Sequence, residues 1–244
     1  MLAMQELQLA GLKVHVRCPS ATLAAKPTFA VVLLHGFGVP GTDLIAVADE
    51  LTAPQGTCFI MPEGPLDLSD SRGAGYAGAR GWWETNEGSL HLARLTGQVQ
   101  LAARGAFEGI QNARQVVIAL LDAIQSEFNL ASERIVLGGF SQGALACLDA
   151  LLHDSRPLAG LIFMSGTLVE ADGFQHLARR RAGMPALLSH GKLDPILPYV
   201  GAETLRAQLV MAGWDVTWVP FPGSHGIPQE VRKAASNALS RWLV

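Results

Sequence analysis

The sequence predicts an α/β protein built on a mostly parallel sheet of about eight strands, with helices on both faces. Short apolar runs alternate along the chain with segments whose apolar residues recur at helical spacing, the pattern of parallel strands joined by helices. The 244 residues fit one large domain, and the 49% that are apolar can form a sizeable core. Because no repeat or linker interrupts the pattern, we expect a single domain over residues 1–244.

The predicted strands fall into two groups with different patterns. Residues 6–9 and 13–18 flank Gly11, and apolar and polar side chains alternate in the second segment, so the two predict a half-buried antiparallel pair. Residues 29–34 form a continuous apolar run, FAVVLL, which is typical of a strand buried on both faces. Five later segments are also predicted as strands: 57–61, 134–137, 160–164, 186–189 and 216–219.

The segments between these strands predict helices. Apolar residues between Ala113 and Phe128 recur at helical spacing, and further helices are predicted at 42–51, 142–153, 174–181, 204–211 and 230–243. Residues 63–108 are the exception, because they hold many glycines and a Trp-Trp pair and show only weak periodicity. A connection this long in a compact domain is usually functional, so we expect an insertion on the substrate side of the domain.

Charge and hydropathy exclude several classes of protein. Eighteen basic and 21 acidic side chains give a formal charge of −3, which argues against a nucleic-acid-binding face. The longest unbroken apolar runs, such as residues 29–34, are too short to span a bilayer, and the N-terminal residues lack the pattern of a secretory signal. We therefore expect a cytoplasmic protein with no integral membrane segment.

The three cysteines, Cys18, Cys58 and Cys147, are an odd number without the spacing of a metal site. Each stands among apolar residues, so we expect all three to be reduced and packed in the core. Motifs for metal or nucleotide binding, such as HExxH and the P-loop, do not occur in the sequence. The sequence thus predicts no disulfide framework, no metal and no cofactor.

A candidate nucleophile stands between a predicted strand and a predicted helix. The segment Gly139 to Gly143 reads GFSQG, the G-x-S-x-G pattern in which Ser141 occupies a sharp turn above the sheet. Side chains two residues before and after the serine would collide with each other or with neighbouring elements, so glycine is needed at both places. The helix that follows directs its N-terminal N–H groups at the site, which favours developing negative charge.

A base and an orienting acid are expected after Ser141 in the order acid, then histidine. Asp194 follows the strand at 186–189 and His225 follows the strand at 216–219, and parallel sheets place their sites beyond such strand ends. Asp172 could serve only from an earlier loop, and Asp215 precedes a strand and would lie at the wrong edge. His190 precedes the acid, and we interpret it as a hydrogen-bonding residue that shapes the Asp194 loop.

An oxyanion hole needs two backbone N–H donors. One is expected from Gln142, directly after the nucleophile, and the other from Phe37 in the HGFG loop that follows the strand at 29–34. The same loop begins a competing motif, because residues 36–41 match G-x-G-x-x-G and Glu63 follows at about the distance of a ribose-binding acid. Residues 73–78 match the same pattern in an obvious loop, and Pro40 lacks the N–H that a pyrophosphate turn would use, so the dinucleotide interpretation is the weaker one.

Several segments together resemble one known family. The segments HGFG, GFSQGA, MSGTL, HGKLDPILP and GSHGIPQE are similar to those of the phospholipase/carboxylesterase family of α/β-hydrolases, which includes acyl-protein thioesterases and small bacterial esterases. The resemblance covers nearly the whole chain. It implies an eight-stranded α/β-hydrolase fold, no cofactor, and Ser141, Asp194 and His225 as the catalytic triad. The family's acid after the HGxG loop is replaced here by Val39, and the stretch after Trp83 is longer than usual, so both departures concern the substrate side.

Three further residues are predicted to contact substrate. The segment Gly81 to Glu84, GWWE, resembles the family's Trp-Phe-Asp segment near the acyl site, which makes Trp82 and Trp83 candidate walls of a pocket. Ile196, just after the acid, could line the same pocket. We therefore expect a serine hydrolase acting on small-molecule carboxylic esters or thioesters. The alternatives are a catalytically silent α/β-hydrolase-fold binding protein and, less favoured, a dinucleotide-dependent oxidoreductase; the sequence does not indicate an oligomeric state.

Overall fold

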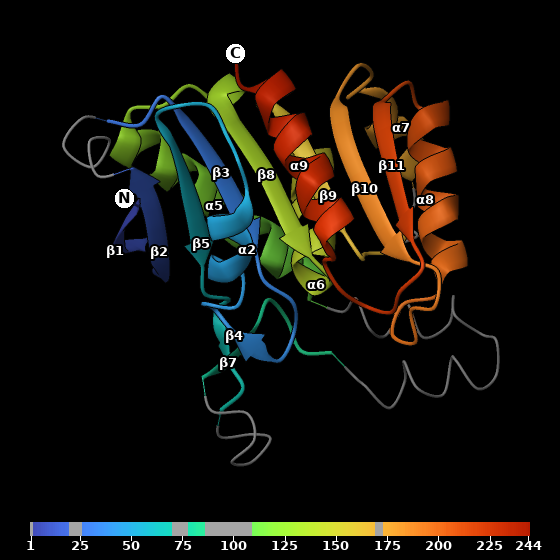
Figure 1. Ribbon diagram of the computed structural model, residues 1–244, viewed down its shortest axis with the longest axis horizontal. Helices are drawn as coiled ribbons and strands as arrows, with labels where there is room; N and C mark the ends of the chain where they lie inside the picture. The colour runs from blue at the N-terminus through green and yellow to red at the C-terminus, as the bar shows by residue number, and fades with distance from the viewer. Residues whose placement is uncertain (1, 20–25, 70–77, 86–108, 169–172) are drawn as a thin grey trace.

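The computed structural model describes residues 2–19, 26–69, 78–85, 109–168 and 173–244. Its main sheet has eight strands in the order β1-β2-β5-β3-β8-β9-β10-β11 (Figure 1). β2 pairs antiparallel with β1 and with β5, and the pairs from β5 through β3 to β11 are parallel. The mostly parallel α/β sheet predicted from the sequence is therefore confirmed.

All eight predicted strands are present, with most bounds within two residues of the predicted ones; β1 begins four residues earlier than predicted and β8 ends three residues later. The early strands are β1 (Leu2–Leu9), β2 (Leu12–Pro19), β3 (Phe29–Leu34) and β5 (Thr57–Pro62). The later strands are β8 (Ile135–Phe140), β9 (Gly160–Met164), β10 (Pro185–Gly191) and β11 (Asp215–Phe221). β3 and β5 are buried along their whole length, as continuous apolar runs between two helical layers should be.

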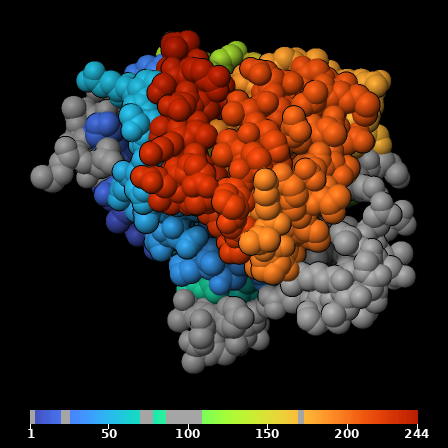
Figure 2. Space-filling model, turned by 45° about the vertical axis from the view of Figure 1, so that its right-hand side comes forward, coloured from blue at the N-terminus to red at the C-terminus, as the bar shows by residue number. Residues whose placement is uncertain are grey.

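Helices cover the sheet from both sides. α2 (Ile45–Glu50) and α9 (Gln229–Trp242) pack on one face, and α5 (Ile110–Phe128) and α6 (Gln142–His153) pack on the other (Figure 1). α7 (Phe174–Arg179) and α8 (Tyr199–Met211) extend the second layer. Figure 2 shows α8 and α9, in orange and red, as neighbouring parts of the molecular surface. α2 is shorter than predicted and α8 begins earlier, at Tyr199.

A second, three-stranded sheet lies beside the first and was not predicted. It consists of β4 (Val39–Pro40), β7 (Ala79–Gly81) and β6 (Leu66–Asp67), in that order. Strands of two or three residues are too short to show any periodicity, so only tertiary pairing reveals them. This small sheet joins the loop after β3 to part of the predicted insertion at 63–108; residues 70–77 and 86–108 of that insertion lie outside the described residues.

The expectation of three reduced cysteines is wrong for two of them. Cys18 and Cys58 form a disulfide with their Cα atoms 4.5 Å apart, and both side chains are buried. In the antiparallel pair of β2 and β5, Arg17 lies opposite Phe59. The next residue of β2, Cys18, therefore lies opposite Cys58. That register is a long-range property, which an odd count of scattered cysteines does not reveal. Cys147 is free and buried, as predicted.

Reduction of the Cys18–Cys58 bond is expected to destabilise the protein. The bond closes a loop with a sequence separation of 40 residues, and the chain-entropy relation gives up to about 4 kcal/mol for a loop of roughly that length. We expect a lower Tm in dithiothreitol, measured by thermal unfolding. The Cys18→Ala/Cys58→Ala double variant should melt lower without reductant and should not respond to it. Equal melting of the wild type with and without reductant would contradict this expectation.

In the part of the chain that the structure describes, no helix combines the length and the apolar character needed to cross a membrane.

Candidate active site

Ser141 stands at a strained turn between β8 and α6. Its backbone has φ 54° and ψ −120°, a conformation that residues other than glycine rarely adopt. The turn is held at both sides, because the Ser141 N–H donates to the Met164 carbonyl at 2.9 Å and the Leu145 N–H donates to the Ser141 carbonyl at 3.2 Å. The geometry is that of a nucleophile elbow, with the serine at the C-terminal end of a central strand.

The glycines on either side of Ser141 are required by their surroundings, as the sequence predicted. A Cβ atom at Gly139 would lie 2.5 Å from the Gly143 carbonyl carbon. A Cβ atom at Gly143 would lie 2.2 Å from the Leu34 carbonyl oxygen. Both distances are far below van der Waals contact, so any larger side chain would force the helix away from the sheet.

Asp194 and His225 come together from the loops after β10 and β11. His225 Nδ1 lies 2.7 Å from Asp194 Oδ2, and the other carboxylate oxygen accepts the N–H groups of Ile196 at 2.7 Å and Leu197 at 2.9 Å. The loops are joined through their backbones, since the Leu193 N–H donates to the Gly223 carbonyl at 2.9 Å. The Asp194 side chain is fully buried and that of His225 is 11% exposed.

His190 is a second histidine on the Asp194 carboxylate. Its Nε2 lies 2.9 Å from the Leu197 carbonyl and 3.2 Å from Asp194 Oδ2, and its side chain is fully buried. Burial by itself would raise the pKa of Asp194, but hydrogen bonds from His190, His225 and the Leu197 N–H outweigh it and hold the pKa well below its usual range. Asp194 is therefore an anion at neutral pH, and His190 shapes its loop as the sequence suggested.

Two contacts bring the His225 loop toward the turn at Ser141. The His225 ring lies 4.7 Å from the ring of Phe140, measured between centroids. The Ser165 hydroxyl, at the end of β9, donates to the Gly226 carbonyl at 3.1 Å. Within the described residues, no hydrogen bond joins Ser141 Oγ to His225, and such bonds often tighten only when substrate binds.

The HGFG loop after β3 lies against Ser141. A Cβ atom at Gly36 would be 3.4 Å from Ser141 Cβ, and the Gly38 N–H donates to the Arg80 carbonyl of β7 at 2.9 Å. The short second sheet thus fixes the loop that carries Phe37. Gln142 is the first residue of α6, where backbone N–H groups have no acceptor within the helix.

His35 supports this loop from within the core. Its Nδ1 lies 2.6 Å from the Gly36 carbonyl and its Nε2 accepts the Gly64 N–H at 2.9 Å, so the ring proton is on Nδ1. Burial lowers the pKa of His35 to about 4, and the hydrogen bond to Gly36 offsets only part of this shift. The ring is therefore neutral at pH 7, as one donating and one accepting nitrogen require.

The depressed pKa of His35 predicts a loss of stability in mild acid. Between about pH 6.5 and 4 the unfolded chain binds a proton at this residue that the folded chain does not, so the free energy of unfolding falls as the pH is lowered. The full contribution is about 3 kcal/mol. Urea unfolding measured across this pH range should show that the free energy of unfolding falls less for His35→Asn than for the wild type. Equal falls in the two proteins would contradict the assignment.

The two tryptophans after β7 are buried. Trp82 and Trp83 are 2% and 5% exposed and pack in the main hydrophobic core, and their contact with substrate stays a prediction. The Trp82 indole N–H donates to the His35 carbonyl at 2.9 Å. Ile196, the third predicted substrate contact, lies on the acid loop and is 42% exposed.

The side chain of Gln142 has a role that the sequence did not suggest. Its Oε1 accepts the Trp82 N–H at 2.9 Å, and its Nε2 donates to the Trp83 carbonyl at 2.9 Å and to Thr85 Oγ1 at 3.0 Å. The amide therefore fastens the segment after β7 to the start of α6. The sequence shows only that an amide side chain follows the serine. It does not show which groups that amide binds.

The rival site residues take no part in this arrangement. Asp172 lies outside the described residues, and Asp215 begins β11, at the opposite end of that strand from His225. Glu63, the acid of the dinucleotide pattern, pairs with His15 at 2.9 Å and is 3.4 Å from both Lys13 and Arg80. A short strand rather than a helix follows the glycines at 36 and 38, so the geometry does not favour a dinucleotide site.

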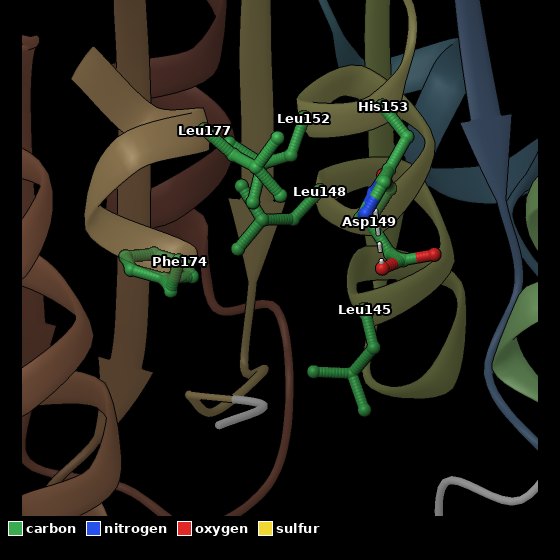
Figure 3. Close-up of a pocket in the computed structure, with 7 residues that line it drawn as sticks. All are labelled: Leu145, Leu148, Asp149, Leu152, His153, Phe174 and Leu177. Atoms are coloured by element: carbon green, nitrogen blue, oxygen red, sulfur yellow. Dashed lines mark hydrogen bonds and ion pairs between the residues drawn. The ribbon is translucent and has the colours of Figure 1, made fainter. Parts of the chain in front are cut away.

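A small apolar gap lies between α6 and α7. The side chains of Leu148, Leu152, Phe174 and Leu177 approach one another there, with Asp149 and His153 at one edge (Figure 3). The gap has a volume of about 20 Å³, which is room for roughly one water molecule. It is therefore a packing defect and not a ligand site. Among the described residues, no group of histidine, cysteine and acidic side chains is placed to hold a metal ion.

Comparison with known proteins decides the family. The family described as Phospholipase/Carboxylesterase matches residues 20–243. The chain belongs to the phospholipase/carboxylesterase family. This confirms the resemblance inferred from its motifs.

Relatives of known name agree with this membership. Acyl-protein thioesterase 1 of Gibberella zeae is 27% identical over 218 residues, covering 85% of this chain and 88% of that protein. Acyl-protein thioesterase 1 of Cryptococcus neoformans is 27% identical over 236 residues, covering 89% and 92%. Both of these relatives are thioesterases by name, and together with its family they make this phospholipase/carboxylesterase family member a hydrolase of the esterase or thioesterase type.

Solved structures show the same fold. Esterase PE8 matches with a TM-score of 0.73 and 26% identity, over 99% of both chains. A carboxylesterase from Mesorhizobium loti matches with a TM-score of 0.74 over 97% of this chain and 98% of that one; at 18% identity this likeness shows the fold alone. The phospholipase/carboxylesterase family member therefore has the α/β-hydrolase fold predicted from its sequence.

Proposed function

We propose that this protein cleaves carboxylic esters or thioesters through an acyl-enzyme intermediate on Ser141. The observation that carries the proposal is the buried Asp194 carboxylate, 2.7 Å from His225 Nδ1, at the same sheet edge as the strained turn at Ser141. A buried anion on one nitrogen of an imidazole holds the ring in the tautomer that leaves the other nitrogen free to accept a proton. No structural role requires that combination beside a serine elbow.

The first half of the reaction acylates the enzyme. His225 removes the Ser141 hydroxyl proton as Oγ forms a bond to the acyl carbon, and the carbonyl π electrons move onto the oxygen. The oxyanion collapses, the bond to the leaving group breaks, and His225 gives its proton to the departing alkoxide or thiolate. In the second half, water attacks the acyl-enzyme in the same way and releases the acid and free Ser141.

The negative charge on the intermediate needs fixed donors. The N–H of Gln142, at the first position of α6, and the N–H of Phe37, in the loop against Ser141, are the proposed pair. The positive end of the α6 dipole adds to the field at the same place. Backbone donors in a rigid turn and a rigid loop need no reorganisation during the reaction, which is the source of their effect.

Turnover of a substrate panel tests the proposal. Purified protein should hydrolyse p-nitrophenyl esters of short, medium and long acyl chains, and the matching acyl thioesters of N-acetylcysteamine, with saturation kinetics. We expect activity on both leaving groups, because the mechanism makes no use of the leaving atom before proton transfer. Binding of the esters without turnover would instead support the silent binding protein, the other candidate for this fold.

A further inference from the structure

We infer that Trp82 is a positioning residue that joins the two halves of the oxyanion hole. The inference rests on the proposed function, because it assigns a role to residues around the donors named there. The two donors come from segments more than a hundred residues apart in the sequence, the loop after β3 and the start of α6. Trp82 is hydrogen-bonded to both segments.

The first connection runs from Trp82 to α6. The Trp82 backbone N–H donates to Gln142 Oε1 at 2.9 Å, and the same amide donates from Nε2 to the Trp83 carbonyl at 2.9 Å. The amide thus accepts one hydrogen bond from this stretch of backbone and donates another to it. The two bonds fix the plane of the amide and the position of Gln142, the first residue of the helix. The backbone N–H of that residue is one proposed oxyanion donor.

The second connection runs from Trp82 to the loop after β3. The indole Nε1–H donates to the His35 carbonyl at 2.9 Å, and the ring packs 5.5 Å from the His35 imidazole between centroids. The His35 side chain in turn contacts the Gly36 carbonyl at 2.6 Å. The two peptide units that flank Gly36 are thereby held, and the second of them carries the Phe37 N–H.

Burial makes these bonds effective as a support. Trp82 is 2% exposed, and His35 and Gln142 are 1% and 5% exposed, so water does not compete for the donors and acceptors. If either bond is lost, one half of the hole can shift relative to the other while substrate binding elsewhere is unchanged. A displacement of about 1 Å at reacting groups can lower a rate by roughly 100-fold.

The test uses two variants and one matched control. Trp82→Phe removes the indole N–H and keeps an aromatic ring, and Gln142→Met removes the amide and keeps the chain length. The control is Trp214→Phe, because Trp214 is 5% exposed and its indole N–H also donates to a buried carbonyl, that of Ala178 at 2.8 Å. Trp82→Phe and Trp214→Phe each lose one indole hydrogen bond and similar packing, so Trp214→Phe is the matched control for Trp82→Phe. Gln142→Met loses three hydrogen bonds and tests the other half of the hole.

Three quantities are measured for each protein: kcat, KM for an ester, and Ki for a trifluoromethyl ketone. Ser141 Oγ adds to the carbonyl carbon of the ketone, and the carbonyl oxygen becomes an oxyanion in the oxyanion hole. The affinity for the ketone therefore reports how well the hole stabilises an oxyanion. We expect Trp82→Phe and Gln142→Met to lower kcat about 10- to 100-fold with little change in KM. Ki should rise in proportion to the loss of kcat/KM, and Trp214→Phe should leave all three quantities near the wild-type values.

The outcomes separate this inference from the proposed function. If the wild type hydrolyses esters and Trp82→Phe keeps its kcat and Ki, the positioning role is wrong and the proposed function stands. If Trp214→Phe loses as much kcat as Trp82→Phe, the effect is general destabilisation and the positioning role is also wrong. A wild type that neither turns over esters nor binds the ketone would overturn both.

Discussion

Replacement of Ser141 by alanine is expected to lower kcat by about 10⁶-fold. The variant lacks the side-chain oxygen that the mechanism bonds to the acyl carbon in the first half, so no acyl-enzyme can form and His225 has no hydroxyl of the protein to activate. KM should change little, because the acyl and leaving groups bind through other residues. The residual rate over water should come from the oxyanion donors and from substrate binding alone.

The measurement is a steady-state assay with a p-nitrophenyl ester, supported by thermal unfolding to show that the variant is folded. Alanine at residue 141 retains a backbone that must adopt φ 54°, so its Tm should stay close to that of the wild type. A folded Ser141→Ala protein with even a hundredth of the wild-type kcat would contradict the assignment, since that rate could not come from the residual donors.

Replacement of Asp194 by asparagine is expected to lower kcat by about 10⁴-fold. The carboxylate accepts four donors: the backbone N–H groups of Ile196 and Leu197, His190 Nε2, and His225 Nδ1. An amide in its place presents an N–H to one of them and removes the buried negative charge. His225 then loses both the tautomer and the stabilised imidazolium that the reaction needs.

A second buried carboxylate provides the control for this variant. Asp149 of α6 is 9% exposed and accepts two hydrogen bonds from Arg114, at 2.7 and 3.0 Å. Asp149→Asn breaks a partly buried ion pair of similar kind and should lower the Tm with kcat nearly unchanged. The expected split is therefore a large loss of kcat in Asp194→Asn and mainly a loss of stability in Asp149→Asn. Similar kcat values in the two variants would contradict the role of Asp194.

The main sheet could be predicted because its central strands are buried on both faces and its helices repeat their apolar residues at regular spacing. β3 and β9, for example, are continuous apolar runs with no competing pattern. The second sheet could not be predicted, since β4 and β6 have two residues each and depend on pairing with β7. The disulfide could not be predicted for a related reason, because only the register of β2 on β5 places Cys18 opposite Cys58.

The residues proposed to react could be found from the sequence because each follows the end of a parallel strand, which puts Ser141, Asp194 and His225 at one edge. His190 was also expected, as a residue that shapes the Asp194 loop, but the supports from Gln142 and Trp82 were not. The Gln142 amide and the Trp82 indole bind backbone groups, and a backbone group carries no signature in the sequence of its partner.

The most direct test of the central claim is covalent labelling by a fluorophosphonate. The reagent should react with Ser141 Oγ only if His225 activates it and the oxyanion donors accept the phosphoryl oxygen. After digestion, mass spectrometry should locate the added phosphonyl group on Ser141 alone, and denatured protein should not react. An unlabelled native protein, or a label on another serine with full loss of ester hydrolysis, would contradict the claim.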